Sequence, residues 1–289
     1  MKIKFPKPNP DWTRKPNPET PGQWHKYYST HPQYVLNLLL KGGAHVDMVP
    51  AIDFDCRSSI TFDCLIDGHL CKFDFSDHEL INRDISYKYR AYFKFHYHES
   101  HSIGPREENI FPFSPVNFHD WDLYKKLAPS INYVANGKVL NNQAPAGAAV
   151  DRRNLVSKML TRKYGKILDK ARHPKEEFFK LINKASAIVC VPGARNNMLD
   201  RGQGQQMMFG ACTISPKLNT RLSYHGMLKP GIHYVECKPD YSNLIEKVNW
   251  VRSHKTQAIE IGKNAKALFL NTSTPAKQVQ WINQCINRL

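Results

Sequence analysis

The feature that most constrains the fold of this chain is an alternation of short apolar runs and polar loops between residues 183 and 238. The apolar runs cover residues 187–191, 212–214 and 233–238, and bases, amides and glycines surround the turns between them. Short apolar strands of this kind are typical of a sheet that is buried on both faces. Because helices must connect parallel strands, the alternation predicts an open α/β sheet that binds its ligand at the carboxyl ends of the strands.

Basic and amide side chains collect directly after the run 187–191. Arg195 and Asn196 lie in the loop that follows Gly193, and Arg201 precedes the glycine-rich turn GQG. Arginine binds phosphate through charge-assisted hydrogen bonds, and glycine lets the backbone approach a phosphate closely. These residues are therefore predicted to contact a diphosphate, the alternative being that they are solvated surface side chains.

Two segments further upstream are also candidates for nucleotide contacts. Residues 131–135 are expected to form a strand that turns out at Asn136 and Gly137. Asp151 is then the predicted N-cap of a helix, which places Arg153 beside free backbone N–H groups at the first turn. Asn136, Gly137 and Arg153 are thus predicted to bind the nucleotide, whereas a solvated helix surface is the alternative for the arginine.

The last hundred residues resemble a known family. Residues 231–250 carry HYV followed by K, D, S, L, EKV and W, and residues 258–269 carry a helix beginning AIEIGKN. This pattern resembles the CAP10-like (family 90) glycosyltransferases, and residues 201–210 are similar to a helix that those enzymes share with exostosin-like glycosyltransferases. The match lies mainly in residues 183–270. It implies a GT-B-like α/β fold, with two Rossmann-like domains facing a cleft, and glycosyl transfer that usually needs no metal.

The resemblance also bears on Gln205 and on the donor. In those families the position of Gln205 generally holds a Glu whose carboxylate binds the ribose hydroxyls. A Gln can accept the same hydrogen bond through its amide oxygen, but the difference leaves the identity of the nucleotide open, and a merely exposed polar residue is the alternative. CAP10-like enzymes commonly use UDP-xylose or UDP-glucose, so the resemblance implies a UDP-sugar donor and a pentosyl- or hexosyltransferase.

The first half is predicted to form a reduced acceptor-side domain over residues 1–128, with the nucleotide-sugar-binding domain at 129–289. Residues 1–23 hold six prolines, which predicts an extended arm. Asp67 and Gly68 separate two β-rich runs, and an Asp-Gly pair in that setting predicts a β-hairpin with a type I′ turn.

An inverting glycosyl transfer needs a general base for the acceptor hydroxyl, and a carboxylate of the N-terminal domain is the expected group. Asp77 lies at the exit of the hairpin's second strand and is the first candidate, followed by Asp74 and then Asp55. A turn or cap carboxylate is the alternative for each. His96 and His98 share a strand face, but no clean third-ligand spacing accompanies them, so no metal site is predicted.

The net charge of +16 is unevenly distributed along the chain. Residues 1–130 contain 16 Lys/Arg and 16 Asp/Glu, whereas residues 131–289 contain 25 Lys/Arg and 9 Asp/Glu. A basic half attracts a nucleotide diphosphate or a nucleic acid, so a nucleic-acid-binding protein is the alternative function. The half shows no RNP-like aromatic run and no zinc-finger spacing, which favours the nucleotide sugar.

Cysteine usage and hydropathy predict the compartment. The seven cysteines form no CxxC pair, and most lie in apolar runs, as buried thiols do in a reducing compartment. The first residues lack the apolar stretch of a signal peptide, and no window approaches the length of a membrane span. We therefore expect a cytoplasmic, metal-independent glycosyltransferase without an integral membrane segment, acting on a glycan or glycoconjugate acceptor and binding no nucleic acid.

Overall fold

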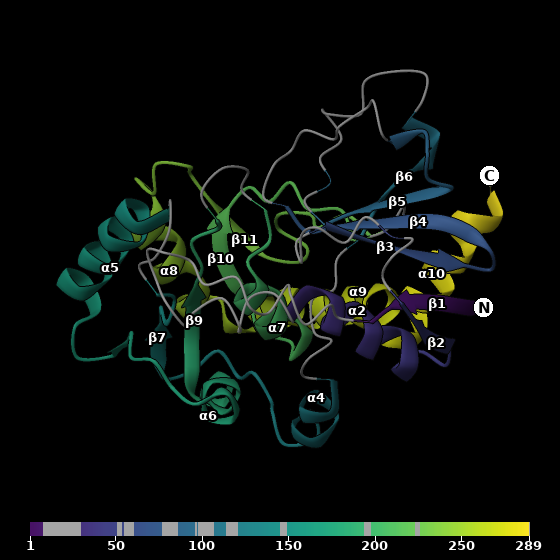
Figure 1. Ribbon diagram of the computed structural model, residues 1–289. Coiled ribbons are helices and arrows are strands. Elements are labelled where there is room, and N and C mark those ends of the chain that lie inside the picture. Colours follow the sequence, from purple (N-terminus) through teal and green to yellow (C-terminus); the bar gives the residue numbers. More distant parts are fainter. Residues whose placement is uncertain are drawn as a thin grey trace, which may run out of the picture. The chain divides into compact units, whose positions relative to one another are not determined.

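The computed structural model describes residues 1–7, 30–50, 54, 61–76, 86–95, 97, 107–113, 121–144, 149–193, 198–222 and 226–288. The chain forms two compact units. The first comprises Met1–His119, Arg221–His225 and Thr272–Leu289, and the second comprises Asp120–Thr220 and Gly226–Asn271. Each unit contains one β-sheet together with helices (Figure 1), which confirms the predicted α/β class.

The first unit is built on a six-stranded sheet with the order β2-β1-β3-β4-β5-β6. Its strands are β1 (Lys2–Pro6), β2 (His45–Val49), β3 (Thr61–Ile66), β4 (His69–Asp74), β5 (Ala91–Lys94) and β6 (Ile110–Pro112). β1 is antiparallel to β3 and β3 to β4, and the other neighbours are parallel. The predicted hairpin is confirmed, because Asp67 and Gly68 join β3 to β4 with φ of 47° and 83°, as a type I′ turn requires.

Strand β1 lies at the start of the proline-rich arm predicted over residues 1–23. Ile3 and Phe5 are buried, while Lys2 and Lys4, which alternate with them along the strand, are exposed. This alternation is that of a half-buried strand, and β1 pairs with β2 on one side and β3 on the other. The residues from 8 to 23 lie outside those that the structure describes.

The C-terminal helix belongs to the first unit. α10 (Pro275–Arg288) contacts α2 (Thr30–Lys41), and both pack on an aromatic core that includes Phe73, Phe93 and Phe111. The indole N–H of Trp281 donates to the carbonyl oxygen of Pro112 at 2.9 Å. This grouping differs from the sequence-based division into 1–128 and 129–289, because an amphipathic helix packs by its apolar face and not by its place in the chain.

The opposite face of β4 and β5 carries buried ion pairs. Lys72 Nζ lies 3.0 Å from an oxygen of Asp63, and Lys94 Nζ lies 3.1 Å from an oxygen of Asp74. The Tyr92 hydroxyl also donates to Asp74, at 2.6 Å. A buried charge is tolerated only when its partner and hydrogen bonds are in place. Loss of one member of either pair would therefore leave an uncompensated charge inside the first unit.

The second unit contains a five-stranded sheet in which every pairing is parallel. Its strands are β7 (Lys138–Leu140), β8 (Leu168–Asp169), β9 (Ala185–Val189), β10 (Thr213–Pro216) and β11 (Val235–Cys237). The spatial order β8-β7-β9-β10-β11 is 2-1-3-4-5 in chain order. The connections therefore reverse direction between β7 and β9, and open α/β sheets bind ligands outside the carboxyl ends of the strands at such a switch point.

The strand predicted at residues 131–135 is wrong. These residues are irregular, and the strand begins only at Lys138. Ala135 and Gly137 have φ of 50° and 107°, outside the β region, so an extended conformation cannot run through them. Ile131 and Tyr133 are nevertheless buried, which explains the strand-like apolar pattern.

Six helices are described in the second unit: α4 (Trp121–Leu127), α5 (Val150–Tyr164), α6 (Lys175–Lys180), α7 (Arg201–Met208), α8 (Leu244–Ser253) and α9 (Lys255–Thr272). Of these, α5, α6 and α7 lie between its strands in the chain. Short 3₁₀ helices are also described, η4 (Glu107–Asn109) in the first unit and η7 (Leu181–Lys184) in the second. Within the described part of the chain, no helix has the length and apolar character that a membrane span needs.

The predicted N-cap of the helix at residues 150–164 is wrong. Ala149, not Asp151, occupies the N-cap of α5, and Asp151 lies in the first turn.

Candidate functional site

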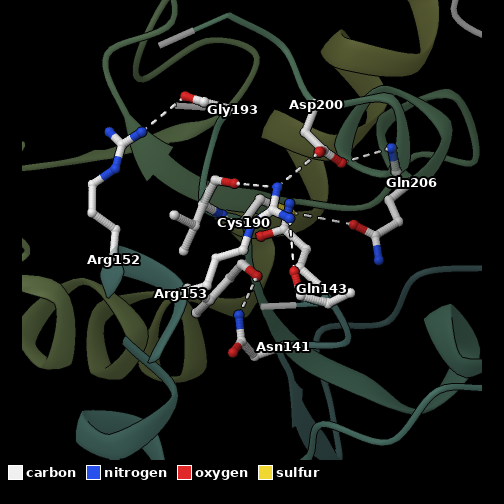
Figure 2. Close-up of polar contacts among 12 residues, drawn as sticks. Asn141, Gln143, Arg152, Arg153, Cys190, Gly193, Asp200 and Gln206 are labelled. Carbon is white, nitrogen blue, oxygen red and sulfur yellow. Dashed lines mark hydrogen bonds and ion pairs between the residues drawn. The ribbon is translucent and has the colours of Figure 1, made fainter. Parts of the chain in front are cut away.

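A cavity of about 190 Å³ lies at the carboxyl ends of β7 and β9, the switch point of the second sheet. Its polar lining comes from the loop after β7, from α5 and from the start of α7 (Figure 2). The lining residues with polar side chains are Asn142, Gln143, Arg153, Cys190, Asp200, Gln203 and Gln206. Pockets for drug-sized ligands measure roughly 300–1,000 Å³, so this cavity has room for only part of such a ligand.

Amide side chains hold the two central strand ends together. Asn141 Nδ2 donates to the carbonyl of Val189 at 3.1 Å, and Gln143 Oε1 accepts from the backbone N–H of Val191. Asn142 is held by Asp169, whose oxygen accepts from Asn142 Nδ2 at 2.8 Å. Backbone polar groups exposed beyond the last ladder bond are thus satisfied by side chains, and the edge of the sheet has a fixed shape.

Asp169 keeps its charge in this position. Burial raises the pKa of its carboxyl, but hydrogen bonds from His173, Asn142 and Lys138 lower it, and the net shift is downward. The carboxylate is therefore ionised near neutral pH and remains an acceptor for Asn142.

Arg153 lies in the cavity wall with its guanidinium already engaged. It donates to the carbonyl of Ala144 at 2.7 Å and to that of Val191 at 3.3 Å, and one nitrogen lies 3.2 Å from a carboxylate oxygen of Asp200. The adjacent Arg152 donates to the carbonyl of Gly193 at 2.9 Å (Figure 2). Arg153 was predicted from the sequence as a nucleotide contact, whereas its ion pair with Asp200 was not predicted.

Asp200 is the N-cap of α7. Its backbone is extended, with φ −68° and ψ 141°, and its side chain accepts from the N–H of Gly202 at 2.9 Å. A carboxylate at this position satisfies an unpaired helix donor and interacts favourably with the helix dipole. One carboxylate thus both caps α7 and pairs with the arginine of α5.

Gln203 is a fully buried amide beneath the cavity. Its Nε2 donates to the hydroxyls of Thr213 at 3.1 Å and Ser215 at 3.0 Å, which fixes the side chain against β10. In either orientation of the amide group, only its oxygen or its nitrogen faces these two hydroxyls, and the other atom needs a different partner.

Four buried polar atoms of the cavity lining have no hydrogen-bond partner among the residues that the structure describes. They are Asn142 Oδ1, Gln143 Nε2, Arg153 Nε and Gln203 Oε1. Buried polar atoms normally have partners, and unpaired ones are costly. All four atoms belong to residues that line one cavity, and the atoms themselves are almost completely covered.

Cys190 contributes a weak donor to the same wall. Burial raises the pKa of its thiol well above the ordinary value, and the thiol donates to Gln206 Oε1 at 3.4 Å. A protonated thiol is a poor nucleophile. Cys190 therefore lines the cavity without being placed to react.

Of the residues predicted from sequence, Arg153 lines the cavity, and Gly193, Arg201 and Gln205 lie close in sequence to lining residues. Gly193 follows β9 and accepts from Arg152. Arg201 is the first residue of α7, stands between two lining residues and exposes its side chain, whereas Gln205 is buried within the same helix. Arg195 and Asn196 lie outside the described residues.

Asn136 and Gly137 are not brought to the cavity. They precede β7, at the amino ends of the parallel strands, whereas the cavity lies at the carboxyl ends. Lys255 Nζ donates to Asn136 Oδ1 at 3.2 Å, and a side chain at Gly137 would collide with the carbonyl of Lys184. They were predicted as contacts because the strand was expected to end, and not begin, at this turn.

Of the acidic candidates, only Asp74 is described. Its side chain is 4% exposed, and its oxygens engage Lys94, the N–H of Ser76 at 2.8 Å and the Tyr92 hydroxyl. A general base must reach the proton of an acceptor, and these contacts are those of a structural carboxylate. Asp77 and Asp55 lie outside the described residues, as do His96 and His98.

Sequence reasoning missed Asn142, Gln143, Asp200 and Gln203. The available signals were the amide cluster NNQ after β7 and an Asp at the N-cap position of the glutamine-rich helix. Each signal is common in loops and helix starts, and only the strand order shows that these segments meet.

No family model matches the chain. It is 28% identical over 69 residues to uncharacterized protein 035R of Invertebrate iridescent virus 3, a match that covers 24% of this chain and 6% of that protein. It is 32% identical over 71 residues to uncharacterized protein 179R of Invertebrate iridescent virus 6, covering 22% of this chain and 6% of that protein. These matches thus span about 6% of the length of the curated relatives.

Solved structures that resemble the chain include Anabaena Alr3699/HepE in complex with UDP and glucose, with 12% identity and a TM-score of 0.48 over 71% of this chain and 65% of that one. The same protein with UDP gives 11% identity and a TM-score of 0.48 over 71% and 66% of the two chains. A glycosyltransferase from Rickettsia africae ESF-5 gives 10% identity and a TM-score of 0.46 over 75% and 69%.

Proposed function

We propose that the chain is a glycosyltransferase that moves a sugar from a UDP-sugar donor to a glycan or glycoconjugate acceptor. The observation that carries the proposal is the polar cavity at the switch point of a parallel sheet with the order 2-1-3-4-5. Doubly wound sheets of this order bind nucleotide ligands at that point. The resemblance of residues 183–270 to CAP10-like glycosyltransferases supports the same function, because this segment supplies β9 and α7.

The donor's diphosphate is proposed to lie at the mouth of the cavity. We assign its neutralisation to Arg201, whose side chain is exposed at the first turn of α7, and to Arg152, which donates to the carbonyl of Gly193. Preorganised donors of this kind stabilise the charge that develops on a nucleotide leaving group. Neutralisation by arginine and backbone amides is the basis for proposing a metal-independent reaction, and the family resemblance favours xylose or glucose as the sugar.

The general base remains a prediction. Asp77 is the first candidate and Asp55 the next, since the contacts of Asp74 with Lys94 and Tyr92 are structural. An Asp→Asn change at the base is expected to abolish turnover without weakening the binding of the donor, because the base contacts the acceptor hydroxyl.

We expect UDP, UDP-glucose or UDP-xylose to raise the melting temperature of the protein in a buffer that contains EDTA. A ligand that binds only the folded state stabilises it by about 2.7 kcal/mol at a hundredfold excess over Kd. Single- and double-stranded oligonucleotides at physiological salt serve as the comparison, because the basic half also suits nucleic acid. A shift with oligonucleotides and none with UDP compounds would establish the alternative function.

A further inference from the structure

Basic side chains are concentrated in the segment that runs from the middle of α5 to the loop after β8. Residues 158–172 contain one carboxylate, Asp169, and six cations: Lys158, Arg162, Lys163, Lys166, Lys170 and Arg172. All six cations are exposed, and none forms an ion pair with a residue in the described ranges. Asp169 does not balance them, because it is buried and engages Lys138 and His173. The described part of the second unit thus leaves a concentrated positive charge uncompensated.

The inner and outer faces of α5 differ in character. Val156, Leu160 and Tyr164 are buried at the spacing of one helix face, and α5 contacts β8 and α8 (Figure 1). Lys158 and Arg162 are four residues apart and exposed, so they are neighbours on the outer face. The cations of the helix therefore point away from the sheet and towards solvent.

The loop after β8 adds its charge to the same surface. Lys170 Nζ donates to the Thr161 hydroxyl at 3.2 Å, so this ammonium lies against α5. Thr161 is three residues after Lys158, which makes the two residues neighbours on the helix. Leu155, three residues before Lys158, is 47% exposed. A large apolar side chain thus stands among the cations.

We propose that this surface docks on an anionic lipid membrane. The basic face, as we name it, comprises Leu155 and the six cations of residues 158–172. A basic helix face with an exposed apolar side chain is typical of proteins that bind a membrane surface without crossing it. Each Lys or Arg near anionic headgroups strengthens binding by roughly fivefold. The inference goes beyond the proposed function and does not depend on it.

Nucleic acid is the other polyanion that a basic surface suits. Sites for single strands combine cations with aromatic side chains on which the bases stack. The only Phe, Tyr or Trp in residues 150–172 is Tyr164, and it is buried on the inner face of α5. An exposed leucine gains nothing from a phosphate backbone, whereas it can enter the boundary between headgroups and acyl chains. The residues of the basic face therefore favour a lipid surface.

Co-sedimentation of the full chain with lipid vesicles tests the proposal without any variant. We expect binding, at about 0.1 M salt, to phosphatidylcholine vesicles that contain roughly one third phosphatidylglycerol, and almost none to phosphatidylcholine alone. Raising the salt to about 1 M should weaken binding by at least roughly tenfold, because salt screens exposed charges. Equal binding to the two kinds of vesicle, or binding to neither, would overturn the inference.

A triple lysine variant locates the contact on the chain. Lys158→Gln/Lys166→Gln/Lys170→Gln removes three charges from the basic face and should weaken binding to the anionic vesicles roughly 100-fold, about fivefold for each charge. The control removes three charges from exposed lysines of the first unit and should stay within about threefold of the wild type; its changes are Lys4→Gln, Lys7→Gln and Lys88→Gln. Equal weakening by both variants would show that only net charge matters, and the basic face would lose its role.

Leu155→Gln distinguishes a lipid surface from a nucleic acid. About half of the leucine side chain remains to be buried, so its loss should weaken vesicle binding about fivefold. Ile232→Gln, at a position that is 45% exposed before β11, is the matched control and should leave vesicle binding unchanged. Vesicle binding that Leu155→Gln leaves unchanged would overturn the lipid assignment. Binding of a duplex oligonucleotide that the triple lysine variant abolishes would then identify nucleic acid as the partner.

Discussion

Replacing Lys94 by Met is expected to lower the free energy of unfolding of the first unit by about 3–5 kcal/mol, measured by urea denaturation. Lys94 is completely buried, and its ammonium lies 3.1 Å from Asp74 and donates to the Ser76 hydroxyl at 2.7 Å. The substitution leaves the carboxylate of Asp74 in the interior without its cation. That desolvated charge, more than the lost attraction, is the source of the destabilisation.

Two controls separate this effect from the general loss of a lysine. Lys138→Met breaks an ion pair with Asp169 whose lysine is 53% exposed, and is expected to cost less than about 1 kcal/mol. The double variant Lys94→Met/Asp74→Leu removes both charges and should recover much of the stability lost in the single variant. A Lys94→Met protein as stable as the wild type would mean that Asp74 is not confined by this pair and is available as a base.

Replacing Arg201 by Ala is expected to weaken donor binding by about 1.5–3 kcal/mol, the value of a charge-assisted hydrogen bond. In terms of Kd this is a rise of roughly 10- to 150-fold, because each 1.4 kcal/mol is a factor of ten. The exposed side chain at the first turn of α7 can reach a diphosphate without leaving the helix surface. Titration with UDP and UDP-glucose measures the effect, and circular dichroism checks the fold.

Arg162→Ala provides the matched control for charge. Arg162 is an exposed arginine in the last turn of α5, roughly 13 Å along the helix from the lining residue Arg153. Its removal lowers the net charge by the same amount and should leave Kd unchanged within about twofold at physiological salt, where distant charges are screened. Equal weakening by both variants would show that only the overall positive charge of this half matters, and Arg201 would lose its assigned role.

The sequence predicted well the elements whose local chemistry permits one conformation. The Asp67–Gly68 turn needs positive φ at both positions, and these residue types accept it readily, so the β3–β4 hairpin was found with its correct turn. The last helix begins at Pro275, and a proline is favoured at the first helical position. Apolar runs likewise located β9, β10 and β11 to within two residues.

Errors arose where tertiary contacts override the local pattern. The apolar spacing of Ile131 and Tyr133 is strand-like, yet positive φ at Ala135 and Gly137 excludes a strand there and moves it to Lys138. This shift of a few residues transferred Asn136 and Gly137 from the predicted ligand edge to the opposite edge. Pairing of the first residues in a sheet was not predicted either, and Ile3 and Phe5 of β1 join the core of the first unit.

The cavity itself was beyond prediction because it depends on strand order. The amides that line it stand in two separate segments, and nothing local distinguishes Gln143 or Gln203 from an ordinary surface glutamine. They meet only because the chain passes from β7 to β8 on one side and returns to β9 on the other. Arg153, Gly193 and Arg201 were found, since the strand–loop–helix alternation places residues of their kind near the carboxyl edge.

Hydrogen–deuterium exchange of the protein with and without UDP-glucose tests the central claim, that the donor binds at the carboxyl edge of the second sheet. We expect slower exchange in peptides that cover residues 140–144, 189–193 and 198–208, which form the strand ends and α7 around the cavity. Peptides from the amino edge, at residues 130–138 and 180–185, should be unchanged. Protection confined to the amino edge, or none at a saturating donor concentration, would contradict the assignment of this site.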